Sequence, residues 1–112
     1  GKYVVFDIET TGFSAMADKI IEIGAVRVEN GIITGRFSEF VNPKIPIPFR
    51  IEKLTSINDS MVAGAETIDT LLPKFIEFCE GAVMVAHNAG DRLYFRRYRG
   101  NGEILTATVK SF

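Results

Sequence analysis

The stretch VVFDIETTG, residues 4–12, decides the fold and raises the question of function. Strand-forming apolar residues end in an acid, an apolar residue and a second acid, followed by two threonines and a glycine. Residues 2–8 are too short for a helix and rich in β-branched and aromatic side chains, which predicts a buried strand. Because residues two apart on a strand share a face, Asp7 and Glu9 are expected on the same side at the strand's end.

The residues that follow predict a hairpin and two short helices. Apolar and polar residues alternate through residues 19–41, and Asn30-Gly31 is a turn signal typical of hairpins. Three prolines in residues 42–49 predict an extended connection. Residues 50–64 have the pattern of two short helical turns.

The next segment completes the expected sheet. An apolar stripe over residues 67–80 is typical of an amphipathic helix, and Pro73 predicts a kink or an early break in it. Residues 82–87 are interpreted as a second buried strand, and residues 91–99 as a short helix. The fold class is therefore α/β: three antiparallel strands, a crossover helix and a parallel strand in one mixed sheet.

Composition sets the outer bounds. The chain has 112 residues, 46% apolar and 24% charged, which fits one globular domain. Its net charge of −1 gives no global basic footprint for nucleic acid. The single cysteine, Cys79, excludes an internal disulfide and is interpreted as a small core residue. No apolar run approaches a membrane span and no signal peptide opens the chain, so a cytoplasmic protein with no membrane partner is expected.

The second buried strand ends in VAHNAG, residues 85–90. If it runs parallel to the first strand, His87 and Asn88 reach the same end of the sheet as Asp7, where ligands of open α/β sheets gather. Carboxylate oxygens suit Mg²⁺ or Mn²⁺, which would relieve the repulsion between Asp7 and Glu9. The simpler alternatives are two exposed acids and a hydrogen-bonded histidine that merely close their strands.

Four stretches, taken in order, carry a family resemblance. VVFDIETTG, KIIEIGAVRVENG, LTSINDSMV and MVAHNA resemble the 3′→5′ exonucleases of the Asp-Glu-Asp-Asp superfamily, histidine subclass. This subclass is typified by the proofreading exonuclease of bacterial DNA polymerase III, above all the form within the Gram-positive replicative polymerase. The resemblance covers about residues 2–90 and implies a ribonuclease-H-like fold with two divalent metal ions, Mg²⁺ or Mn²⁺. It also implies hydrolysis of the terminal phosphodiester at a single-stranded DNA 3′ end. The expected partner is a polymerase subunit or the remainder of a larger polymerase chain.

The resemblance also assigns roles to individual residues. Asp7 and Glu9 are expected to be the catalytic metal ligands, and Asp91 is a further candidate ligand. The expected substrate-binding residues are Thr10, Thr11, Gly12, Phe13, His87, Asn88 and Phe95.

After residue 90 the chain departs from the family pattern. Arg92 occupies the position of the third acid, and Asp91 comes one residue early, about 100° away on a helix. The family's last motif supplies a histidine that acts as general base, and then an aspartate. Here His87 is the only histidine and no aspartate follows Asp91. We therefore expect an incomplete C-terminal part and an impaired enzyme. The alternative is an incompetent fragment that binds metal or single-stranded nucleic acid, or only self-associates.

The last 22 residues form a divergent basic tail. Residues 1–90 carry 8 Lys/Arg and 12 Asp/Glu, whereas residues 91–112 carry 5 and 2. The tail is interpreted first as a solvated segment, with a nucleic-acid contact through its arginines and tyrosines or a shifted reading frame as alternatives. The whole chain is expected to be a single partial domain. Its two buried-type strands need cover on both faces of the sheet, so a homodimer that uses residues 91–112 is predicted.

Overall fold

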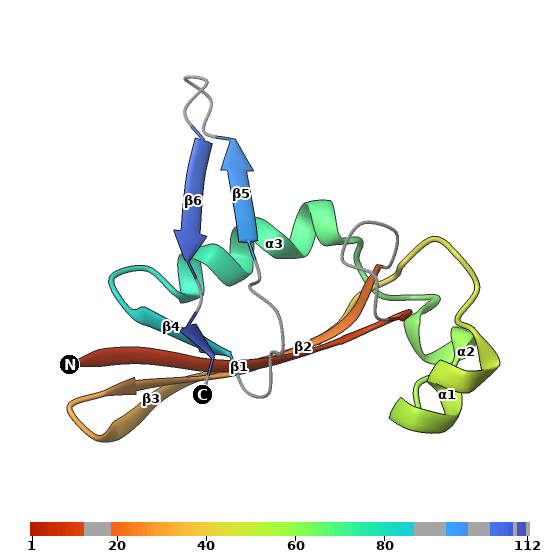
Figure 1. Ribbon diagram of the computed structural model, residues 1–112, viewed down its shortest axis with the longest axis horizontal. Coiled ribbons are helices and arrows are strands. Elements are labelled where there is room, and N and C mark those ends of the chain that lie inside the picture. Colours follow the sequence, from red (N-terminus) through yellow and green to blue (C-terminus); the bar gives the residue numbers. More distant parts are fainter. Residues whose placement is uncertain (13–18, 87–93, 99–103, 109, 112) are drawn as a thin grey trace.

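The computed structural model describes residues 1–12, 19–86, 94–98, 104–108 and 110–111, and Figure 1 shows their arrangement. The strands are β1 (Lys2–Thr10), β2 (Ile20–Glu29), β3 (Ile32–Phe40), β4 (Val83–Ala86), β5 (Tyr94–Tyr98), β6 (Ile104–Thr108) and β7 (Lys110–Ser111). The helices are α1 (Phe49–Thr55), α2 (Asp59–Val62) and α3 (Ile68–Phe78). A five-stranded sheet has the order β3-β2-β1-β4-β7, and β5 and β6 form a separate two-stranded sheet.

The antiparallel half of the sheet follows from its turn. Asn30 and Gly31 have φ values of 51° and 80°, the left-handed conformation that a two-residue hairpin turn requires. This turn sets β2 against β3 over the register from Glu29↔Ile32 to Glu22↔Phe40. The predicted hairpin is confirmed.

The parallel half depends on helix α3. β1 pairs with β4 in parallel from Tyr3↔Val83 to Phe6↔Ala86. The connection from β3 to β4 contains α3 and carries the chain across the sheet to the other side of β1. The predicted mixed sheet, with three antiparallel strands and one parallel strand, is therefore confirmed. Of the kink or early break predicted at Pro73, the early break is wrong, because α3 continues to Phe78. Packing of the helix on the core outweighs the one backbone hydrogen bond that a proline removes.

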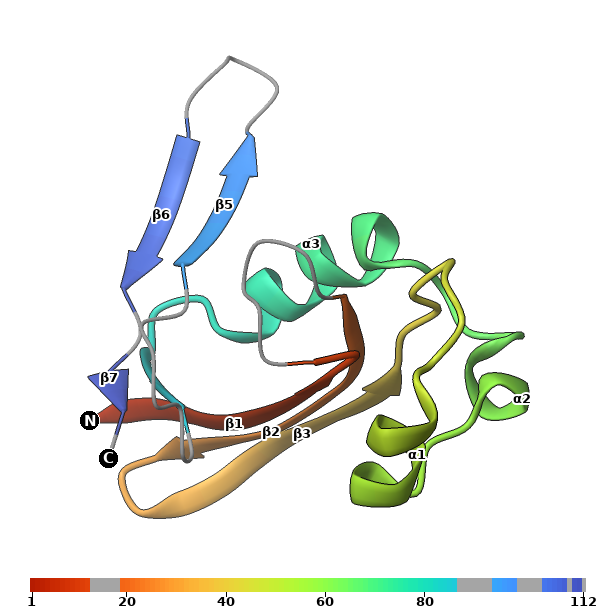
Figure 2. The ribbon, with the colours of Figure 1, turned by 45° about the vertical axis from the view of Figure 1, so that its right-hand side comes forward.

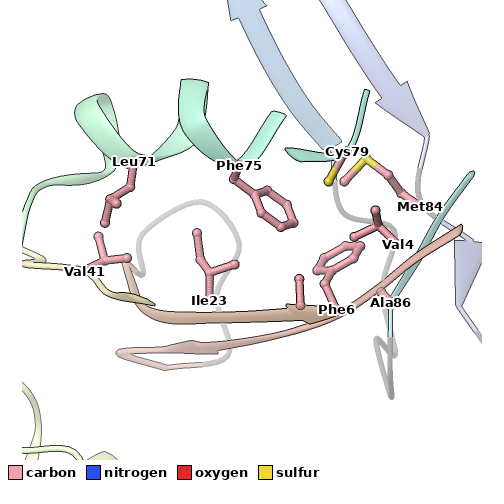
Figure 3. Packing of buried hydrophobic residues seen from close by; sticks show 10 residues of the cluster. Val4, Phe6, Ile23, Val41, Leu71, Phe75, Cys79, Met84 and Ala86 are labelled. Carbon is pink, nitrogen blue, oxygen red and sulfur yellow. The ribbon is translucent and has the colours of Figure 1, made fainter. Parts of the chain in front are cut away.

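One face of the sheet packs against α3 to form the core, shown in Figure 3. Phe75 projects from the helix onto Phe6 of β1, and Cys79, the C-cap residue of α3, lies near Val4. Leu71 lies farther along the helix, beside Val41. Phe75 is fully buried, and its ring centroid lies 5.5 Å from that of Phe6 and 5.4 Å from that of Phe37. Other members of this cluster are Ile23, Ala25, Val41, Met84 and Ala86. Cys79 is a buried core residue, as predicted.

Helices α1 and α2 lie beyond the end of β3 (Figure 2), where a second, smaller cluster of buried side chains holds them. Ile21 of β2 packs there with Ile51 and Val62 of the two helices. The side chain of Asn58 caps α2 by accepting a hydrogen bond of 3.1 Å from the Met61 N–H. These helices lie at the same end of the sheet as the end of β1.

The tail differs from the prediction. Residues 94–98, expected within a short helix, form strand β5, which pairs antiparallel with β6 from Tyr94↔Thr108 to Tyr98↔Ile104. The helix prediction overlooked the partner segment: residues 104–108 are rich in β-branched residues, and Asn101-Gly102 is typical of a hairpin connection. In Figures 1 and 2 this hairpin extends away from the five-stranded sheet. Two residues of β7 pair with β4 at the sheet edge.

Candidate active site

The alternation of β1 separates the core residues from the carboxylates. Val4 and Phe6 are buried against α3, whereas Asp7 and Glu9 lie on the opposite face of the sheet. Asp7 is exposed and Glu9 is half-buried. The sequence prediction that both acids share one face near the end of the strand is consistent with this arrangement, and their role stays a prediction.

The neighbouring strand adds a third acid. Glu22 of β2 is aligned with Glu9, and Gly24 is aligned with Asp7. Residues aligned in an antiparallel pair have side chains on the same face, about 4.5–5.5 Å apart at Cβ. Partial burial, then the charge of Asp7, then that of Glu22, raise the pKa of the Glu9 carboxyl above its ordinary value. The face therefore concentrates negative charge where a cation would be stabilised.

A shallow hollow of ≈ 360 Å³ opens over these residues. The acids Asp7, Glu9 and Glu22 line one part of it, and Arg36 and Ser38 of β3 line another. A methyl group added at Gly24 would meet nothing within 4 Å, which shows that the space beside Asp7 is open. Sequence reasoning missed Glu22 of β2 and Arg36 and Ser38 of β3. The alternation of KIIEIGAV, which places Glu22 on the face away from the core, was the signal that could have identified Glu22.

The segment after Glu9 is held in place by its own hydrogen bonds. The ladder to β2 shifts register between Glu9 and Thr10, and the Thr10 hydroxyl donates to the Gly12 carbonyl. Thr11 is buried, and its hydroxyl accepts a hydrogen bond of 2.9 Å from the Lys19 N–H. The Thr11 N–H donates in turn to the Lys19 carbonyl, at 2.8 Å. Contacts of Thr10, Thr11 and Gly12 with a nucleotide stay predictions.

Of the other predicted site residues, the structure describes only Phe95. Phe13, His87, Asn88 and Asp91 lie outside the described residues. Phe95 belongs to β5, in the hairpin. The last residue of β4, Ala86, is aligned with Phe6, immediately before Asp7. The predicted parallel alignment of the two strand ends is therefore confirmed up to the residue that precedes His87.

The described part of the chain does not form a complete metal site. Within it, no group of three or more His, Cys, Asp or Glu side chains is arranged to hold a metal ion. Asp7 and Glu9 provide the hard oxygen ligands that Mg²⁺ and Mn²⁺ prefer, so their chemistry fits such an ion.

None of the helices described is both long and apolar enough to span a bilayer.

Comparison of the sequence with known proteins places the chain among nucleases. The profile of the exonuclease (RNase T) family matches residues 4–92. The PolC-type DNA polymerase III of Clostridium perfringens is 61% identical over 88 residues, which are 79% of this chain and 6% of that protein. The epsilon subunit of DNA polymerase III from Aquifex aeolicus is 43% identical over 105 residues, covering 89% of this chain and 52% of the subunit. The chain thus spans a small part of the first relatives and about half of the subunit.

Solved structures agree with the sequence comparison. Exonuclease X in complex with 5′ overhanging duplex DNA superposes with a TM-score of 0.65 at 32% identity, over 78% of this chain and 49% of that one. A product-bound exonuclease I superposes with a TM-score of 0.71 over 79% of this chain and 22% of that one. At 13% identity this second likeness shows the fold alone. The chain belongs to the exonuclease family, and it is similar in sequence to PolC-type DNA polymerase III and to an epsilon subunit of DNA polymerase III.

Proposed function

We propose that Asp7 and Glu9 form the metal-binding part of a 3′→5′ exonuclease site that removes nucleotides from the 3′ end of single-stranded DNA. The observation that carries this proposal is their placement: both acids lie on the open sheet face near the end of β1, beside the parallel strand β4. A proofreading role follows from the polymerase relatives, and the natural partner would be a polymerase subunit or the remainder of a larger polymerase chain.

The two carboxylates would hold one or two divalent ions, Mg²⁺ or Mn²⁺. Such ions activate water and screen phosphate charge during phosphodiester hydrolysis. Partial burial and the charges of Asp7 and Glu22 raise the pKa of the Glu9 carboxyl, so a bound cation would relieve repulsion between the acids as well as bind to their oxygen atoms. Gly12 leaves the backbone after β1 without a side chain, and Thr10, Thr11, Phe13, His87, Asn88 and Phe95 are the proposed contacts to the substrate strand.

A second candidate function rests on the residue inventory. The only histidine of these 112 residues is His87, and no aspartate follows Asp91. We propose that residues 1–112 on their own hydrolyse DNA slowly or not at all, because loss of general-base catalysis costs on the order of 10²–10⁴-fold. Under this alternative, the chain binds metal and single-stranded nucleic acid without efficient turnover, and residues 91–112 remain a divergent segment of one partial domain.

The experiment follows a 5′-labelled single-stranded oligonucleotide in Mn²⁺, with both trimming and binding measured. We expect slow trimming at most, and metal-dependent binding that Asp7→Ala abolishes. Glu39→Gln, which removes a carboxylate on β3 outside the hollow, is the matched control and should behave as wild type. Trimming or binding that survives Asp7→Ala would place the site elsewhere. Rapid trimming by the wild-type chain would refute the second candidate function.

A further inference from the structure

One cation shares the hollow with the carboxylates. Arg36 lies on β3, an edge strand of the five-stranded sheet, and lines the same hollow as Asp7, Glu9 and Glu22. Its side chain is exposed, and it forms no ion pair with any residue that the structure describes. Three acids therefore lie near a guanidinium group that none of them neutralises.

The strand register fixes how far Arg36 lies from the acids. Ser38 is aligned with Gly24, which is aligned with Asp7, and Arg36 lies two residues earlier on β3. With neighbouring strands about 4.8 Å apart and a rise of about 3.4 Å per residue, the Cα atoms of Arg36 and Asp7 are roughly 12 Å apart. This offset places Arg36 two strands away from Asp7 and level with Val5, so it suits contact with a more distant part of the same DNA strand.

The negative charge of the hollow favours a cationic contact to DNA. Carboxylates repel a phosphate backbone, and metal ions at Asp7 and Glu9 would offset this repulsion only on the β1 side of the hollow. Arginine binds phosphate oxygens through two parallel hydrogen bonds. Resting on the proposed function, we propose that Arg36 binds a backbone phosphate of the single-stranded DNA upstream of the 3′ end and holds the strand across β2 and β3.

Salt-dependent binding separates this role from a general effect of charge. Affinity for a fluorescein-labelled single-stranded oligonucleotide is measured by anisotropy at constant Mn²⁺ and increasing KCl. Arg36→Gln should weaken binding about tenfold, the lower end for a hydrogen bond to a charged group. It should also reduce the slope of log affinity against log salt by about 0.7, the value for one single-strand phosphate. Arg36→Lys should retain the slope.

Lys74→Gln is the matched control, because it removes one positive charge from α3, on the covered side of the sheet. It should leave affinity and slope near the wild-type values. If Arg36→Gln binds as wild type, or if both variants lose affinity equally, the role of Arg36 is refuted while the proposed function stands on the Asp7→Ala result. If the wild-type chain shows no binding, both proposals fail. Circular dichroism checks that each variant is folded.

Discussion

Replacing Glu22 with glutamine is expected to stabilise the metal-free protein at neutral pH. Glu22 is aligned with Glu9 across the β1–β2 ladder, and its charge contributes, after burial and Asp7, to the raised pKa of Glu9. Like charges directly opposite each other on an antiparallel pair destabilise a sheet by about 0.2–1 kcal/mol. For a domain of this size the same free energy corresponds to roughly 1–5 °C in Tm.

The direction of the pKa shift fixes how this gain depends on pH. Glu9 titrates at its ordinary pKa in the unfolded chain and at a higher pKa in the folded protein. At pH values below the pKa of Glu9 in the unfolded chain, Glu9 is protonated in both the folded and the unfolded state. The repulsion between Glu9 and Glu22 then does not lower the stability of the fold. The cost develops as the pH rises through the folded pKa. The stabilisation by Glu22→Gln should therefore be complete near neutrality and should vanish below about pH 4.

Thermal unfolding followed by circular dichroism, in the presence of a chelator, measures the effect at both pH values. Glu39→Gln is the control with the same charge change, since Glu39 is aligned with Ile23 and lies on the face that α3 covers. An unchanged or lower Tm for Glu22→Gln at neutral pH would refute the reasoning. An equal gain in the control would show that net charge, and not the Glu9–Glu22 pair, is responsible.

Three further predictions concern the core and the open face. Phe75→Ala should destabilise the protein by about 3–5 kcal/mol, measured by urea denaturation, because it empties a fully buried site; a loss below about 1 kcal/mol would contradict this packing. Burial raises the pKa of the Cys79 thiol to about 12, so a thiol reagent at mildly alkaline pH should label it only after denaturation, and rapid labelling of the folded protein would be the opposite result. Tyr3 and Val83 are 46% and 47% exposed on the face away from α3, so light scattering over a range of concentrations should show self-association, whereas a monomer throughout would contradict it.

The sequence was most informative where local and tertiary preferences agree. β1, the Asn30-Gly31 turn and the α3 stripe were predictable because β-branched and aromatic composition, turn chemistry and helical periodicity each indicate the observed element. Pro73 shows the limit of local rules, since α3 is stabilised by contacts with strands far away in the sequence. Residues 94–98 show the same limit, because a strand is defined by its partner.

The candidate site was predictable only in part for a related reason. Asp7 and Glu9 are neighbours on one strand, so their common face follows from alternation alone. Glu22 and Arg36 join them only through the register of three strands, which a shift at Glu9/Thr10 and another at Arg27/Val28 alter. The hydrogen bonds of Thr11 with Lys19 depend on the same register.

Titration of the protein with Mn²⁺ by calorimetry tests the central claim most directly. The wild-type chain should bind the ion weakly, since two carboxylates supply only part of a complete ligand set, and Asp7→Ala should bind none. Glu39→Gln should retain wild-type binding, because its carboxylate lies outside the hollow. Equal binding by the wild type and Asp7→Ala would remove Asp7 from the metal site and contradict the account of the open sheet face as the active site.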